Sequence, residues 1–186
     1  MRVSVRTSEI QSAFAAVKDS SAFEESARLF AAGKLPVEMI QAMALRPELL
    51  RAFGAVSESI YPGGIVERRT KELIILEASR RNACQFCTSS HVSIARMLGI
   101  GDDTGNPLAL LDRPDLMNER ERLAVEYVRS AQRDSNRIAS EFFDRLRRAY
   151  SDAEVVELTA TIGLITMLNL FNNCLQVTYR GEYDAA

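Results

Sequence analysis

The chain has 186 residues, of which 47% are hydrophobic and 26% are charged, and its formal net charge is −2. This is ordinary for a globular domain, so we expect a single domain over residues 1–186, with no electrostatic reason for it to bind nucleic acid. We expect no membrane partner, because no apolar run approaches the roughly 20 residues that span a bilayer. The N-terminus lacks the apolar stretch of a secretory signal, which favours a cytoplasmic location.

Helix signals recur along the first half of the chain, and strand signals do not. Capping residues and prolines predict where these helices begin, and Gly33 suits the position just after one of them. Helices are expected to begin near Ser8, Ser21, Pro36 and Pro47, followed by a turn at residues 61–64.

The second half shows the same signals, including a long apolar stretch near the C-terminus whose length and capping favour a helix over a strand. Helices are expected over residues 66–81, from Asn82 to Leu98, from Asn118, over about 139–150 and from Ser151 to about Val177, with a loop at 101–107. The predicted fold class is all-α.

The stretch NACQFCTSSH, residues 82–91, holds two of the three cysteines and the only histidine. If Asn82 is the N-cap, the rotation of about 100° per residue places Cys84, Cys87 and His91 on one narrow face of the helix. Thiolates are favoured at helix N-termini, in Cys-x-x-Cys motifs and beside a histidine. The local chemistry is therefore that of an activated dithiol.

The preceding helix offers a carboxylate to the histidine. If the two helices form an antiparallel hairpin, Glu72 lies level with His91, and Glu77 lies level with Cys87. These two glutamates are about 140° apart around their helix, so both cannot face the dithiol. We favour Glu72, because a carboxylate that orients a histidine base completes a relay to the thiol.

Other interpretations of the same residues remain open. Two cysteines and one histidine could bind zinc, with Glu72 or water as the fourth ligand, although structural zinc sites usually show a second Cys/His pair. The cysteines could also be core residues of a purely structural helical protein. Cys174, far along the chain, is expected to be a buried small hydrophobe.

The segment ERRTKELIILEASRRNACQFCTSSHVSIARMLGI, residues 67–100, resembles the signature of the carboxymuconolactone decarboxylase/AhpD-like superfamily. The pattern is a Glu, the first Cys of Cys-x-x-Cys twelve residues later, and a His four residues past the second Cys; Glu72, Cys84, Cys87 and His91 match it. The resemblance extends over about 45–177, and residues 1–44 match less clearly. It implies an AhpD-like helical bundle built around a Cys-x-x-Cys hairpin.

Because the dithiol is present, the chain resembles the alkylhydroperoxidase branch of that superfamily. This implies an antioxidant oxidoreductase that reduces hydroperoxides without a cofactor and is recharged by a dithiol or lipoyl-type electron donor. The resemblance makes Cys87 the peroxidatic thiol, Cys84 the resolving thiol, and Glu72 with His91 the proton relay. The helix dipole instead favours Cys84 as the thiol of lower pKa.

Two further expectations follow from the resemblance. Phe86 stands where the best-known AhpD proteins carry a second histidine. The alternative activity is that of a non-redox, decarboxylase-like enzyme on the same scaffold.

The final helix is apolar on more than one face, so it is buried either centrally or against other subunits. With the resemblance, this favours a homo-oligomer, a trimer or a hexamer.

Overall fold

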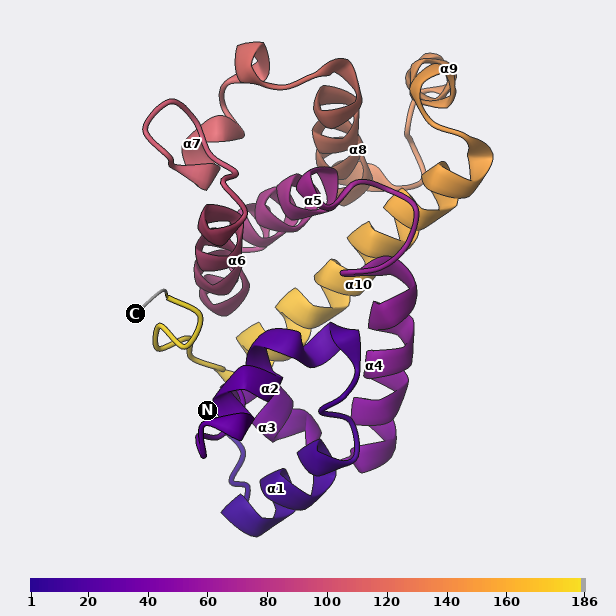
Figure 1. The fold of residues 1–186 in the computed structure, drawn as a ribbon. Coiled ribbons are helices and arrows are strands. Elements are labelled where there is room, and N and C mark those ends of the chain that lie inside the picture. Colours follow the sequence, from indigo (N-terminus) through magenta and orange to yellow (C-terminus); the bar gives the residue numbers. More distant parts are fainter. Residues whose placement is uncertain (185–186) are drawn as a thin grey trace.

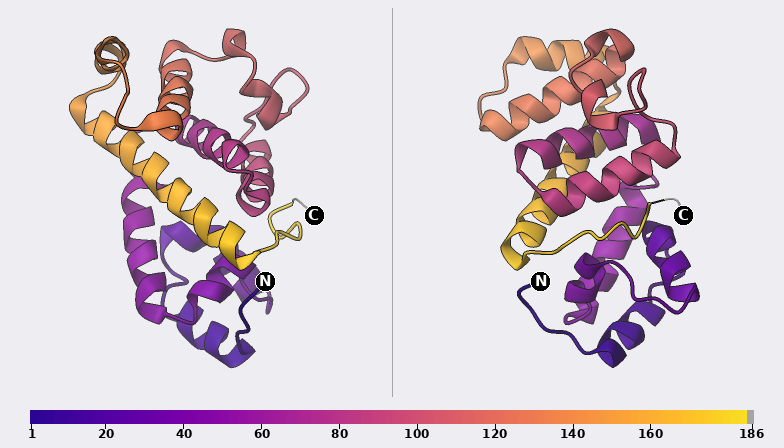
Figure 2. Two further views of the ribbon diagram at one scale, coloured as in Figure 1. Left: turned by 180° about the vertical axis from the view of Figure 1, so that it is seen from behind. Right: turned by 90° about the vertical axis from the view of Figure 1, so that its left-hand side faces the viewer.

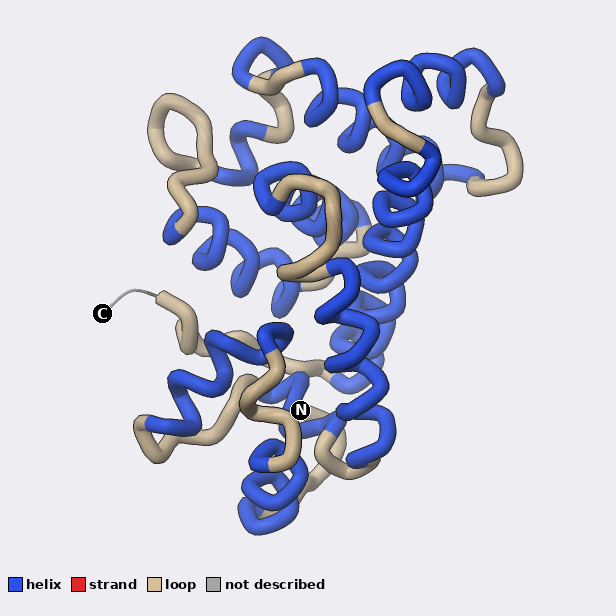
Figure 3. Tube along the Cα trace, turned by 45° about the vertical axis from the view of Figure 1, so that its right-hand side comes forward, coloured by secondary structure: helices blue, strands red, loops and turns tan. Residues whose placement is uncertain are grey.

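The computed structural model describes residues 1–184, and this part of the chain is helical without any strand (Figure 3). The prediction of an all-α fold is confirmed. In chain order the elements are α1 (Thr7–Ala15), the 3₁₀ turn η1 (Ser21–Phe23), α2 (Glu24–Ala31), α3 (Glu38–Met43), α4 (Pro47–Ile60), α5 (Arg68–Arg81), α6 (Gln85–Met97), α7 (Pro107–Leu110), η2 (Pro114–Leu116), α8 (Glu119–Asp134), α9 (Ser140–Ala149) and α10 (Asp152–Leu175).

The long helix α10 runs diagonally through the molecule and separates two groups of helices (Figure 1). On one side α5 packs against α6 and α8, and on the other side lie the N-terminal helices α1 to α4. In the right-hand view of Figure 2, α5 and α6 lie side by side and α10 crosses behind them. One hydrophobic core joins the N-terminal helices to α5, α6, α8, α9 and α10.

Helix α5 is buried around nearly its whole circumference. Its residues from Thr70 to Ser79 are all buried, because Leu73 and Leu76 enter a second core formed with α6, α7 and α8, whereas Ile74 and Ile75 enter the main core. A carboxylate on this helix must therefore find partners inside the protein. This explains how Glu72 and Glu77 come to be almost fully buried.

The capping signals set several helix ends as expected. Asn118 and Ser151 each form a capping box, with Glu121 and Glu154 respectively, and Pro47 occupies the first turn of α4. These local signals succeed because the capping partners lie only three residues away.

The boundary between α5 and α6 differs from the expectation. Asn82 is not the N-cap of α6 but the C-cap of α5, and Cys84 is the N-cap of α6. The chain reverses at Ala83, which has a left-handed φ of 50°. The amides of Ala83 and Cys84 bond back to the carbonyls of Arg80 and Ser79, at 3.2 and 3.0 Å, as in a Schellman motif.

The turn at residues 61–66 is fastened to α10 by a buried ion pair. Nζ of Lys71 lies 2.6 Å from Oε1 of Glu157, and the Glu157 carboxylate also accepts the amides of Ile65 and Val66 at 2.7 and 3.0 Å. Gly64 has a φ of 91°, and a Cβ there would clash with the Glu157 carboxylate. The glycine of the predicted turn is thus required both by conformation and by space.

By length and composition alone, α10 is apolar enough to cross a membrane, which the sequence analysis did not anticipate. Its 18-residue apolar stretch has a mean hydropathy of 1.4, and a third of that stretch is buried in the protein. Core helices meet the same criterion, and α10 packs against α4, α5, α6 and α9, so this single helix is weak evidence for a membrane span.

Candidate active site

Glu72 and His91 meet between α5 and α6. Nδ1 of His91 lies 2.8 Å from Oε2 of Glu72, whose side chain is completely buried. When Nδ1–H donates to the carboxylate, Nε2 is the ring nitrogen left to accept or release a proton. His91 lines a cavity, so the carboxylate holds a ring that is able to exchange a proton with the contents of that cavity.

Two more residues hold the Glu72 carboxylate. Tyr61 and Arg68 both donate to its Oε1, at 2.7 and 2.8 Å, and Arg68 also donates to the Tyr61 hydroxyl at 2.7 Å. Burial by itself would raise the pKa of Glu72, but the charge and hydrogen bond of His91, together with Arg68 and Tyr61, hold that pKa below its usual value. The carboxylate therefore stays ionised beside the histidine.

Glu77 has different partners. Its carboxylate pairs with Arg80 at 2.6 Å and with Arg129 of α8 at 2.9 Å, on another face of α5. Of the two glutamates considered from the sequence, the structure brings Glu72 and not Glu77 to the histidine.

The two thiols form a coupled pair at the start of α6. Both are free and buried, with Cys84 at the N-cap and Cys87 in the first turn. The pKa of Cys84 is lowered to about 7, chiefly because the Cys87 thiol donates a hydrogen bond to its sulfur. The pKa of Cys87 is raised well above its usual value by the same bond and by burial. The pair therefore loses its first proton easily, and the charge rests on Cys84.

The thiol with the higher pKa is the one that the cavity reaches. Cys87, but not Cys84, lines the cavity that His91 also lines. The thiol that meets the contents of the cavity is thus Cys87, while the thiol of lower pKa is Cys84.

The sequence analysis missed two asparagines on α10 that bond to the thiols. Nδ2 of Asn172 lies 3.2 Å from Sγ of Cys87, and a hydrogen bond from Asn169 lowers the pKa of Cys84. Asn169 is itself fixed by Asn82, whose Nδ2 donates to its Oδ1 at 2.9 Å. The available signal was that asparagines within an apolar helix need buried partners.

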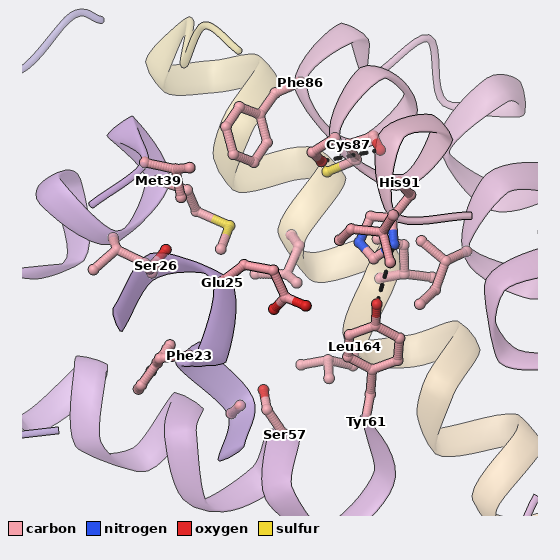
Figure 4. A pocket seen from close by; sticks show the side chains of 18 of the residues that line it. Phe23, Glu25, Ser26, Met39, Ser57, Tyr61, Phe86, Cys87, His91 and Leu164 are labelled. Carbon is pink, nitrogen blue, oxygen red and sulfur yellow. Dashed lines mark hydrogen bonds between the residues drawn. The ribbon is translucent and has the colours of Figure 1, made fainter. Parts of the chain in front are cut away.

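The cavity opens between the dithiol and the N-terminal helices (Figure 4). Its volume is about 90 Å³, several times the space that one buried water needs. Cys87, His91 and Tyr61 lie on one side of it, and Phe23, Met39, Phe86 and Leu164 supply apolar surface.

Two other expectations concern the cysteines. Cys174 was expected to be buried, and this is wrong: it is exposed, because it falls on the outward face of α10. Regarding zinc, no group of three or more His, Cys, Asp or Glu side chains within residues 1–184 is arranged to hold a metal ion.

Known proteins resemble this chain in sequence and in fold. Residues 47–129 match the model of the carboxymuconolactone decarboxylase family. The uncharacterized protein YdfG of Bacillus subtilis is 30% identical over 105 residues, which cover 56% of this chain and 71% of YdfG. A putative antioxidant defence protein AhpD of Agrobacterium tumefaciens is 27% identical, with a TM-score of 0.64 over 75% of this chain and 95% of that one.

A second solved structure shares the fold over nearly the whole chain. The debrominase Bmp8 is 22% identical, with a TM-score of 0.75 over 98% of this chain and 94% of its own. A variant of Bmp8 in which alanine replaces a cysteine has been solved in complex with 2,3,4-tribromopyrrole. At this identity the likeness concerns the fold alone. The match to the family model, the 30% identity to YdfG and the AhpD-like structure from Agrobacterium tumefaciens show that the chain belongs to the carboxymuconolactone decarboxylase/AhpD-like superfamily.

Proposed function

We propose that the protein is a thiol-dependent peroxidase of the Cys-x-x-Cys branch, which reduces alkyl hydroperoxides and is recharged by a dithiol or lipoyl-type donor. The observation that carries the proposal is the arrangement of Cys87 and His91 on one cavity, with a thiol partner of pKa about 7 behind Cys87 and a buried carboxylate behind His91. Perturbed thiols beside a fixed base are the arrangement that nucleophilic catalysis requires.

The first step oxidises Cys87. Its proton shifts along the hydrogen bond to the Cys84 sulfur, which leaves the negative charge on the thiol that faces the cavity. The Cys87 thiolate then attacks one peroxide oxygen, the O–O bond breaks, and the sulfur becomes a sulfenic acid. His91 already carries the proton that the thiol pair lost when it ionised. The leaving alkoxide takes this proton from His91 and departs as an alcohol.

The second step closes a disulfide. The Cys84 sulfur attacks the Cys87 sulfenic acid, hydroxide leaves, and the Cys84 proton completes a water molecule. Two thiols and one hydroperoxide thus give a disulfide, an alcohol and water. A dithiol donor restores the pair by exchange and becomes a disulfide itself.

The experiment that tests this proposal uses the reduced protein and one equivalent of cumene hydroperoxide. We expect two thiols to be lost and a Cys84–Cys87 disulfide to form, as mapped by mass spectrometry. We expect Cys87→Ser to form no intramolecular disulfide. Thiols that remain reduced over an hour would contradict a peroxidase.

Reductive dehalogenation is a second candidate, favoured by the apolar cavity in front of Cys87 and by the fold shared with a debrominase. In that reaction the Cys87 thiolate takes the bromine from carbon, a proton replaces it on carbon, and Cys84 displaces bromide to form the disulfide. An aryl bromide and two thiols then give an arene, a disulfide and hydrogen bromide. Release of bromide from 2,3,4-tribromopyrrole by the reduced protein measures this activity.

The setting and assembly are part of the same proposal. A dithiol that cycles between the reduced form and the disulfide suits a reducing compartment such as the cytoplasm.

The outward face of α10 carries exposed apolar side chains: Val156, Met167 and Leu170 are 69%, 46% and 66% exposed. We propose that a second copy of the chain covers this face in a homo-oligomer.

A further inference from the structure

The cavity has polar groups on the side opposite the dithiol. Ser57 of α4 and Glu25 of α2 both line it, and their oxygen atoms are directed into the space between the N-terminal helices and His91 (Figure 4). Neither residue takes part in the proposed thiol chemistry.

Ser57 is the more unusual of the two. It is only 3% exposed, and its Oγ has no hydrogen-bond partner within residues 1–184. Ser59, two residues further along α4, shows the usual alternative, in which the hydroxyl donates to the carbonyl of Ala55 at 3.0 Å. A buried hydroxyl without a partner is costly, so the Ser57 hydroxyl is available to whatever fills the cavity.

Glu25 adds an acceptor to the same cavity. Its side chain is 25% exposed, and its nearest cation, Arg28, lies on the solvent side of α2 at a distance of 3.5 Å. Because Glu25 also lines a shallower surface depression with Arg28 and Lys34, it stands where the cavity approaches the surface. A carboxylate in that position accepts hydrogen bonds and repels anions.

Most of the remaining lining is apolar, and the hydroxyls of Ser90 and Thr161, which also line the cavity, donate to backbone carbonyls. Phe23, Val37, Ile40, Ile75 and Leu168 are buried core residues that also line the cavity. An apolar cavity with a few convergent polar groups is the usual form of a small-molecule site, in which the polar groups fix the orientation of the ligand.

We propose that the cavity binds a small, uncharged, largely apolar molecule whose hydroxyl or N–H group is held by Ser57 and Glu25 while its opposite end faces Cys87 and His91. The binding mode is inferred from the cavity itself. That the ligand's end near Cys87 is the reacting end rests on the proposed function. Ser57 and Glu25 are specificity residues in this account, and ligands that carry a carboxylate are rejected by Glu25.

Binding of three matched ligands to the reduced protein, measured by calorimetry, tests the proposal without any turnover. The ligands are 4-isopropylphenol, 4-isopropyltoluene, in which a methyl group replaces the hydroxyl, and 4-isopropylbenzoate. We expect the phenol to bind about tenfold or more tightly than either of the others, because a hydrogen bond to a charged acceptor contributes about that much.

Matched variants locate the preference. Ser57→Ala and Glu25→Gln reduce the advantage of the phenol over the toluene to less than about threefold, and Glu25→Gln also improves binding of the benzoate. The controls Ser59→Ala and Glu24→Gln, on the same helices but outside the cavity, keep the wild-type preference. If Ser57→Ala does not fold, as judged by circular dichroism, Ser57→Cys replaces it.

Equal binding of the three ligands, no binding of any of them, or a preference unchanged in both cavity variants would overturn the proposal. A preference for the phenol in a protein that neither consumes peroxide nor releases bromide would leave the binding mode standing and refute the proposed function instead. The two failures are therefore distinguishable.

Discussion

Nδ1 of His91 lies 2.8 Å from Oε2 of Glu72, although the two residues belong to different helices. The reversal at Ala83 brings these helices together, and the burial of α5 on all sides places the carboxylate out of water. The carboxylate remains ionised because Arg68, Tyr61 and His91 outweigh the cost of burial. The relay is thus a property of the packing between α5 and α6.

The thiol pair is expected to titrate near neutral pH. In a Cys174→Ser background, absorbance of the thiolate at 240 nm will rise with a midpoint at about pH 7, because the Cys87 thiol stabilises the Cys84 anion, and a second rise will follow at much higher pH. The rate of oxidation by peroxide will rise with pH through the same midpoint and then level off, since only the ionised pair supplies a nucleophile. Absence of any thiolate below pH 8 would contradict the coupling.

The Asn172 side chain is expected to stabilise the reacting thiolate. Asn172→Leu removes the bond of 3.2 Å to Cys87, so less of the negative charge can move to the Cys87 sulfur and oxidation should slow about tenfold. The rate midpoint should stay near pH 7, because it belongs to Cys84. The control is Asn173→Ala, because Asn173 donates to the carbonyl of Asn82 and not to a sulfur. Stopped-flow thiol oxidation that is equally fast in both variants would exclude a role for Asn172.

The exposed face of α10 is expected to be an interface. Leu170→Lys places a charge on this face and should reduce the mass measured by light scattering to that of the monomer. Leu49→Lys, at an exposed leucine of α4 on a different surface, should leave the mass unchanged. A wild-type protein that is already monomeric at tens of micromolar would refute the proposed oligomer.

The buried Lys71–Glu157 pair is expected to be a main determinant of stability. Lys71→Met leaves the Glu157 carboxylate buried with fewer partners and should lower the free energy of unfolding by about 3–5 kcal/mol, measured in urea. Arg69→Met, which breaks a pair with Glu121 through a half-exposed arginine, should cost clearly less. Equal losses would show that burial of the ion pair is unimportant.

The sequence predicted the fold class and much of the helix pattern because those signals are local. The caps at Asn118 and Ser151 depend on residues three positions away, and the pairing of Glu72 with His91 follows from regular helix geometry on either side of one reversal. The boundary at residues 82–84 was misplaced because Asn82 suits either end of a helix, and only the left-handed Ala83 decides between them.

What depends on contacts between distant segments was not predictable from one sequence. Asn169 and Asn172 reach the thiols from more than 80 residues away, and their role emerges only when α10 packs on α6. Likewise, the cavity needs the N-terminal helices, where the family resemblance was weakest. The exposure of Cys174 depends on which face of α10 the rest of the chain covers.

Glu72→Gln and Glu77→Gln form a matched pair of variants that separates the proton relay from the general loss of a buried carboxylate. Both are buried carboxylates on α5 that pair with arginine, but only Glu72 holds His91. We expect the Cys84–Cys87 disulfide to form at least about a hundredfold more slowly with cumene hydroperoxide in Glu72→Gln, as followed by stopped flow, because the histidine loses the carboxylate that orients it as a base. Glu77→Gln should react within about threefold of the wild-type rate, even if it is less stable. Equal rates in the two variants would contradict a proton relay from Glu72 through His91 to the dithiol.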